Sequence, residues 1–284
     1  MEHNLYEQEL QLALRLARDA GAAILDLYDG PLHVERKTGN DNYNEPVTVA
    51  DRAANELIVR GIRQAFPDDG ILAEESVDTQ RRLGKRRVWM VDPLDGTKGF
   101  IARSGDFAVQ IGLAVDGAAV VGVVYQPLPD LLYSAASGTG TWIDRAGFSP
   151  ERAEVSKQSD IKRMRLAASR SHRSQRMDRI IRTLGIEEEV LRDSVGVKVG
   201  LIIERQCDIY IHTSPLTKQW DTCAPEVVLR EAGGSFTDIF GGPMSYNSPD
   251  VQNQNGIVAS NGAAHQRIIE ELSPLLAEFG RVRV

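Results

Sequence analysis

The chain has 284 residues, of which 42% are hydrophobic and 26% charged, and its net charge is −7. This length suits one large core or two fused lobes, and the acidic balance argues against a protein that coats nucleic acid. No apolar run reaches the roughly 20 residues that span a bilayer. With only Cys207 and Cys223, and no zinc-like spacing, a reducing cytoplasm is the expected location.

The first half of the chain reads as two helices followed by a sheet. Apolar residues at helical spacing predict helices over residues 5–28 and 48–66, separated by a polar loop at 38–46. Asp116-Gly117 joins two β-rich runs and predicts a hairpin. The strands expected in this half are 33–37, 71–73, 88–91, 107–115, 118–125, 131–136 and 141–143.

The pattern changes near residue 155 to alternating strands and helices, which indicates a second α/β lobe. We therefore predict an N-terminal α+β lobe at 1–155 and a C-terminal α/β lobe at 156–284. The strands expected in the second lobe are 166–168, 208–212 and 256–260, and the helices are 173–184, 197–204, 224–232 and 263–279.

Four acidic signals stand at the ends of these elements, where scattered surface acids are not expected. They are Asp51, Glu74-Glu75, Asp92 with Asp95, and Asp221. Any one of them alone could equally be a solvated surface group. Together they favour a hard cation such as Mg²⁺, which binds carboxylate, carbonyl, water and phosphate oxygens.

The stretch DPLDGTKGF, residues 92–100, has the features of such a site. A strand is predicted to end at Asp92, and Asp95 could face the same side, with the carbonyl of Leu94 between them. Gly96 lets the backbone approach a ligand closely, and Thr97 begins a helix whose first N–H groups suit a phosphate. The sequence thus predicts a cation on one side and a phosphoryl group on the other.

Four sequence elements resemble those of the lithium-sensitive, Mg²⁺-dependent phosphatases, the superfamily of inositol monophosphatases, fructose-1,6-bisphosphatases and bisphosphate nucleotidases. Their order and spacing agree over nearly the whole chain. The resemblance implies a layered αβαβα sandwich. The elements are Pro46–Asp51, Glu74–Ser76, the Asp92–Thr97 run DPLDGT, and the Trp220–Pro225 run WDTCAP.

The resemblance also implies roles for individual residues. Glu74, Asp92, Asp95, Asp221 and the Leu94 carbonyl are expected to bind two or three Mg²⁺ ions. Asp51 and Thr97 match the pair that orients and deprotonates the attacking water, and Gly96 and Thr97 are expected next to the substrate phosphate. Lithium inhibition is expected from the same resemblance.

The second lobe is expected to carry the substrate contacts. The segment Ser169–His172 resembles the T-R-S-H element of bisphosphate nucleotidases, so Arg170, Ser171 and His172 are candidate contacts. Lys198 lies in an S-x-G-x-K element, where a solvated lysine at a helix start is an equally good interpretation. Glu204 matches a glutamate of the relatives, although Arg205-Gln206 follows where they have Gly-Lys.

These similarities favour a 3′(2′),5′-bisphosphate nucleotidase that converts 3′-phosphoadenosine 5′-phosphate to AMP and phosphate. Its partner would be a small phosphate ester, with no nucleic acid polymer and no membrane, and the chain could be a monomer or a homodimer. The first alternative is an inositol monophosphatase or a related sugar phosphatase. A second is a regulatory binding protein that reuses the fold without catalysis.

Overall fold

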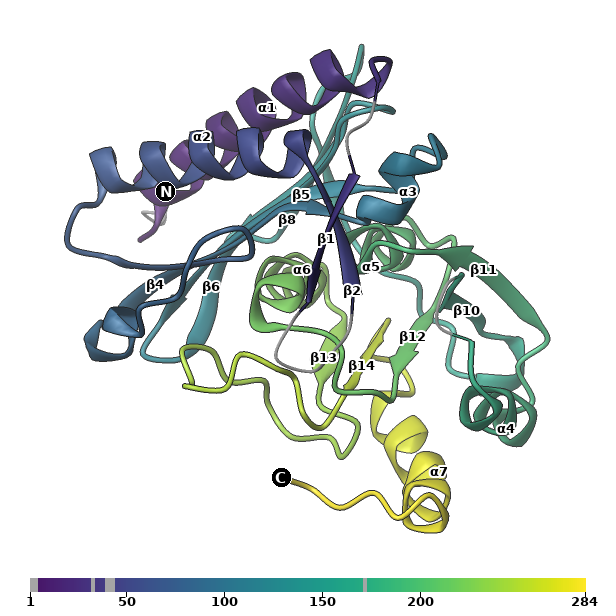
Figure 1. The fold of residues 1–284 in the computed structure, drawn as a ribbon. Helices are drawn as coiled ribbons and strands as arrows, with labels where there is room; N and C mark the ends of the chain where they lie inside the picture. The colour runs from purple at the N-terminus through teal and green to yellow at the C-terminus, as the bar shows by residue number, and fades with distance from the viewer. Residues whose placement is uncertain (1–4, 32–33, 39–43, 171–172) are drawn as a thin grey trace.

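The computed structural model describes residues 5–31, 34–38, 44–170 and 173–284. The chain forms five layers, in the order helices, sheet, helices, sheet, helices (Figure 1). Three apolar cores lie between the layers, and the central core includes residues of both sheets and of the helices between them. The αβαβα sandwich expected from the sequence is confirmed.

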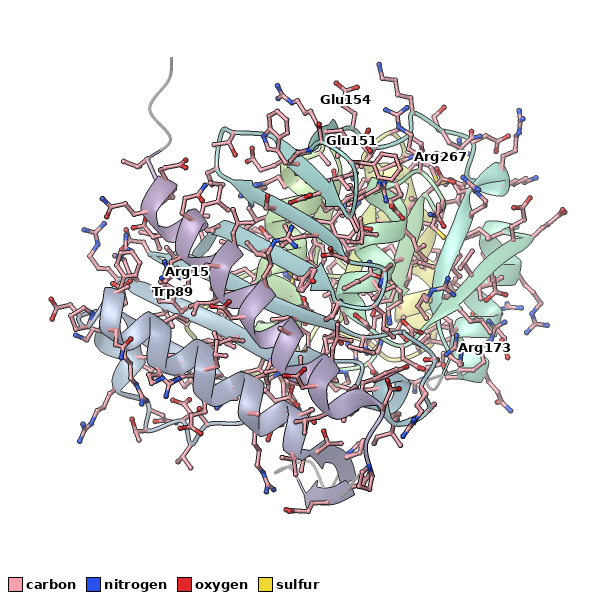
Figure 2. All side chains as sticks on the ribbon, turned by 90° about the horizontal axis from the view of Figure 1, so that it is seen from above. Arg15, Trp89, Glu151, Glu154, Arg173 and Arg267 are labelled. Atoms are coloured by element: carbon pink, nitrogen blue, oxygen red, sulfur yellow. The ribbon has the colours of Figure 1, made fainter. Side chains whose placement is uncertain are left out.

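The first layer consists of α1 (Glu7–Tyr28) and α2 (Val49–Ala65), as predicted to within two residues at each end. Seen from above, the two helices lie next to each other across the large sheet, and Arg173 lies away from them beside the second sheet (Figure 2). They approach closely because a Cβ atom on Gly61 would lie only 2.4 Å from Leu16. Their apolar faces form one core with the outer face of the sheet.

The second layer is a seven-stranded sheet in the order β3-β4-β5-β6-β7-β8-β9, in which β3 and β4 are parallel and the other pairs antiparallel. The predicted hairpin is present, and Asp116 and Gly117 both have positive φ, as a tight hairpin turn requires. The strands are β3 (Gly70–Ala73), β4 (Arg87–Asp95), β5 (Ala108–Val115), β6 (Ala118–Gln126), β7 (Leu131–Ala136), β8 (Thr141–Arg145) and β9 (Glu151–Ala153).

The fourth layer is a five-stranded sheet in the order β11-β10-β12-β14-β13. Its outer face packs in one apolar core with α4 (Gln175–Leu184) and α7 (His265–Glu278). The strands are β10 (Arg165–Ser169), β11 (Glu188–Arg192), β12 (Ile209–His212), β13 (Ser235–Thr237) and β14 (Ile257–Ser260).

The middle helical layer, α5 (Val195–Ile203) and α6 (Gln219–Glu231), contacts both sheets. The boundary predicted near residue 155 falls between the last strand of one sheet and the first strand of the other. Because α5 and α6 pack against both sheets, the division into lobes 1–155 and 156–284 stays a prediction.

Some local predictions differ from the structure. The loop expected at 38–46 includes part of a second short strand, since β1 (Val34–Thr38) pairs with β2 (Asn44–Thr48). The helix predicted from 224 begins five residues earlier, at Gln219, so that Asp221 lies in its first turn. Shorter helices are α3 (Thr97–Ile101) and the 3₁₀ turns Arg81–Gly84 and Ile161–Arg163. Among the described residues, no helix is both long and apolar enough to cross a bilayer.

Two glycines let α6 lie directly on the large sheet. A Cβ atom at Gly122 of β6 would stand 2.4 Å from the carbonyl oxygen of Ala224, and one at Gly112 of β5 would stand 2.7 Å from the sulfur of Cys223. These approaches are closer than a side chain allows. The sheet therefore determines how deep the first turns of α6, with Asp221, sit in the molecule.

We expect Gly122→Ala to lower the free energy of unfolding by about 1–3 kcal/mol, because the added methyl group must push the α6 backbone away from the sheet. Urea denaturation measures this change. Gly84→Ala is the matched control, since a Cβ atom there meets nothing within 4 Å. Equal stability of the two variants would contradict the close packing.

Candidate active site

The strand that carries the first pair of carboxylates is longer than predicted. It was expected to end at Asp92, but β4 continues to Asp95. Residues three apart in a regular strand point to opposite faces. Here the pairing shifts between Asp92, opposite Gln110, and Asp95, opposite Ala108, so β4 contains one extra residue. This bulge, which includes Pro93, brings both carboxylates to one cavity.

The cavity has a volume of about 150 Å³ and lies between the two sheets. All four predicted carboxylate ligands line it, although they come from separate parts of the chain. Glu74 follows β3, Asp92 and Asp95 lie on β4, and Asp221 lies in the first turn of α6. Leu94, Gly96, Thr97 and Lys198 line the same cavity.

Asp92 lies at the electrostatic centre of this group. Its side chain is 2% exposed, and burial raises its pKa well above the ordinary value. The charges of Glu74, Asp95 and Asp221 and a hydrogen bond with Glu74 raise the pKa further. One oxygen also accepts a hydrogen bond from the backbone N–H of Leu94, at 3.0 Å. A cation among these carboxylates would relieve their repulsion.

Asp95 is held through one of its two oxygens. Its Oδ2 accepts hydrogen bonds from Gln110 Nε2 at 2.5 Å, Ser194 Oγ at 2.5 Å and Gly196 N at 2.9 Å. Burial raises the pKa of Asp95 to about 6, although the bonds from Ser194 and Gly196 and the charge of Lys198 act in the opposite direction. None of these three donors contacts Oδ1, so that oxygen can face a ligand in the cavity.

Asp51 and Thr97 are brought together as predicted. The hydroxyl of Thr97 donates a hydrogen bond of 3.0 Å to Asp51 Oδ1. The other carboxylate oxygen caps the start of α2, accepting from the N–H and the hydroxyl of Thr48 at 2.8 and 2.6 Å. Burial is the largest effect on Asp51 and raises its pKa to about 6. Thr97 lines the cavity, and Asp51 lies behind it.

The donor set fits a hard divalent cation, because it consists of buried carboxylates that repel one another. Among the described residues, however, no three His, Cys, Asp or Glu side chains stand at the spacing of a metal site. Side-chain rotations would be needed for Glu74, Asp92, Asp95 and Asp221 to bind one ion together.

Only some of the predicted substrate residues line the cavity. Lys198 lines the cavity, is 1% exposed, and donates to Ser169 Oγ at 3.1 Å and to the carbonyl of Asp193 at 3.0 Å, so it is not a solvated lysine. Burial lowers its pKa to about 8. Arg170 lies near Asp106 and Asp193, at 3.5 and 3.6 Å, and is not among the lining residues.

Glu204 is also absent from the cavity lining and pairs with Arg145 beyond the end of α5. Ser171 and His172 lie outside the described residues. The substrate roles of these three residues and of Arg170 stay predictions.

Sequence reasoning missed Tyr210 and His212, which line the cavity from β12. The alternation of residues along this strand could have predicted their position. Ile209 and Ile211 belong to the core on the outer face of the second sheet, so Tyr210 and His212 face the other sheet. A second hollow of about 310 Å³ shares Ser169, His212 and Leu216 with the first cavity. Its other lining residues include Arg173, Ser174 and Met177.

The five layers and the carboxylate-lined cavity define a class of metal-dependent phosphomonoester hydrolases. The chain belongs to the inositol monophosphatase family, whose model matches residues 5–277. It is 37% identical over 243 residues to the 3′(2′),5′-bisphosphate nucleotidase CysQ of Escherichia coli (strain K12), covering 84% of this chain and 93% of that one.

Two further comparisons agree with this assignment. The inositol-1-monophosphatase of Bacillus subtilis (strain 168) is 28% identical over 264 residues, covering 92% of this chain and 95% of that one. The crystal structure of CysQ from Bacteroides thetaiotaomicron matches with a TM-score of 0.77 and 31% identity, covering 91% of this chain and 99% of that one.

The bond from Ser194 to Asp95 generates a prediction about metal affinity. Ser194 also caps α5 by accepting from Val197 N at 3.0 Å, so Ser194→Ala should cost about 1 kcal/mol of folding free energy. It should in addition weaken Mg²⁺ binding about 10- to 100-fold, as loss of a residue that orients a ligand does. Isothermal titration with Mg²⁺ measures the affinity.

Ser174→Ala is the matched control, because Ser174 caps α4 through a similar bond to Met177 N, at 3.2 Å, without touching a cavity carboxylate. It should lose about 1 kcal/mol of folding free energy through the lost cap and keep its Mg²⁺ affinity. If both variants bind Mg²⁺ as the wild type does, Ser194 serves only as a helix cap.

Proposed function

We propose that this protein is a Mg²⁺-dependent 3′(2′),5′-bisphosphate nucleotidase that hydrolyses 3′-phosphoadenosine 5′-phosphate to AMP and phosphate. The observation that carries the hydrolase assignment is the single cavity shared by Glu74, Asp92, Asp95, Asp221 and Thr97. The substrate class is supported by the 37% identity to a protein named as a bisphosphate nucleotidase.

The metal ions would be held by Glu74, Asp92, Asp95, Asp221 and the carbonyl of Leu94. Bound there, they supply positive charge that offsets the phosphoryl oxygens and increases the acidity of water. The same charge explains how a family member tolerates so many buried carboxylates around one cavity. Inhibition by Li⁺ is part of this proposal.

The chain itself would supply the base. Thr97 donates its hydroxyl hydrogen to Asp51 and keeps its oxygen lone pairs to accept a hydrogen bond from water. The water would then pass a proton to the Thr97 oxygen while Thr97 passes its own hydroxyl proton to Asp51, whose pKa of about 6 suits a base near neutral pH. Water oxygen bonds to phosphorus, the ester P–O bond breaks, and the leaving alkoxide takes up a proton.

The second hollow supports a substrate with a large alcohol part. It adjoins the cavity through Ser169, His212 and Leu216, and adds about 310 Å³ beyond the place of the reacting phosphate. A nucleoside extends further than an inositol ring and could occupy both spaces. Arg173 lines this hollow and pairs with Asp178 and Glu189.

We expect phosphate release from 3′-phosphoadenosine 5′-phosphate to exceed that from inositol 1-phosphate, to require Mg²⁺, and to stop with EDTA or Li⁺. Steady-state kinetics on both esters measures this preference. Asp95→Ala, which removes a proposed ligand, should abolish turnover and keep the fold, as checked by circular dichroism.

A preference for inositol 1-phosphate would overturn the nucleotide assignment and leave the hydrolase assignment standing. Absence of Mg²⁺-dependent turnover on every phosphate ester tried would contradict both, and would favour a binding protein that reuses the fold.

A further inference from the structure

Tyr210 presents a buried hydroxyl beside the cavity. The residue lies on β12, lines the cavity and is 1% exposed. Its hydroxyl is inaccessible to solvent and makes no hydrogen bond to any described residue. Buried polar groups are nearly always paired, because leaving one unpaired costs folding free energy. An unpaired hydroxyl on a residue that lines a ligand cavity therefore points to a partner that arrives with the ligand.

The surroundings of Tyr210 keep this hydroxyl protonated. Burial and the nearby charges of Asp95 and Asp221 raise the pKa of Tyr210 well above its ordinary value. The ammonium group of Lys198 lies 4.6 Å from the centre of its ring and thus contacts the aromatic face. The phenol is consequently a neutral hydrogen-bond donor whose ring lies against a cation.

The position of Tyr210 also suits contact with a substrate. Glu74, Asp92 and Asp95 belong to the side of the large sheet, whereas Ser169 and Tyr210 belong to the second sheet, so the cavity has walls from both. An ester whose phosphate lies by the carboxylates must extend toward the second sheet to reach the adjoining hollow. The hollow joins the cavity at Ser169, His212 and Leu216. Lys198 connects this junction to Tyr210, because its ammonium group donates to Ser169 Oγ and contacts the Tyr210 ring.

We propose that the Tyr210 hydroxyl donates a hydrogen bond to an oxygen of the bound phosphate ester and that Tyr210 is a substrate-binding residue. This inference deepens the proposed function and rests on it. The oxygen could belong to the phosphoryl group or to the alcohol part of the ester. Inhibition by inorganic phosphate and by AMP distinguishes the two.

Tyr210→Phe removes only the hydroxyl and keeps the ring that Lys198 contacts. We expect kcat/KM for 3′-phosphoadenosine 5′-phosphate to fall about 10-fold, mainly through KM, which is the usual worth of one neutral hydrogen bond. The thermal midpoint should stay the same or rise, since no protein hydrogen bond is lost. The rise of this midpoint with added Mg²⁺ should be unchanged.

Tyr28→Phe is the matched control. Its hydroxyl is also buried without a hydrogen bond to any described residue, but it lies in the core under α1, against Phe100 and Phe107. This variant should keep the kinetics of the wild type. An unchanged kcat/KM in Tyr210→Phe would overturn the inference, and so would a loss of the Mg²⁺-induced rise, which would assign the hydroxyl to the carboxylates.

Inhibition constants locate the contact. If inorganic phosphate inhibits Tyr210→Phe about 10-fold more weakly than the wild type, the hydroxyl touches a phosphoryl oxygen. If only inhibition by AMP is weakened, it touches the alcohol part. Failure of the proposed function is distinguishable, because the wild type would then not hydrolyse the nucleotide. The Tyr210 contact would still be testable by calorimetry with inorganic phosphate and Mg²⁺.

Discussion

The mutual repulsion of buried carboxylates is the constraint on which the rest of this structure depends. Asp92 and Asp95 are nearly inaccessible to solvent and lie in one cavity with Glu74 and Asp221. Burial disfavours their charged forms and raises the pKa of both. Such a cluster opposes folding, and strands and helix starts that pack in large apolar cores hold each carboxylate in place.

Asp95 shows how the two halves of the chain meet at the site. One of its oxygens accepts from Gln110 on the large sheet and from Ser194 and Gly196 at the start of α5. The neighbouring helix α6 lies so close to the large sheet that only glycine fits at Gly122 beneath it. The middle helices thus pack against both sheets, and the start of α5 supplies hydrogen-bond donors to Asp95.

The second sheet contributes its own residues to the wall of the cavity. Tyr210 and His212 come from alternate positions of β12, and the hollow beyond them is lined by β10, α4 and the segment after β12. Carboxylates from the large sheet and from the start of α6 form one part of the cavity wall, and Tyr210 and His212 of the second sheet form another.

Local sequence patterns determined most of the elements and the chemical character of the site. The resemblance of the motifs around Asp95 and Asp221 to those of a known family implied that these carboxylates act together, and both line one cavity. Apolar spacing predicted α1 and α2, and Asp116-Gly117 predicted the hairpin. These features depend on neighbours a few residues away, which is why a single sequence shows them. Short strands such as β11 and β13 were missed, because their stability comes from pairing and not from local preference.

Only the tertiary structure decided which buried polar groups meet. The β-bulge that brings Asp92 and Asp95 to one face depends on pairing with β5. The bond from Ser194 to Asp95 joins residues 99 positions apart, and Tyr210 reaches the cavity only because the two sheets lie face to face across α5 and α6. Conversely, Glu204 resembles a substrate residue in sequence, yet it pairs with Arg145 outside the cavity lining. The spacing of residues along the chain does not predict such long-range contacts, because they arise from the packing of the layers.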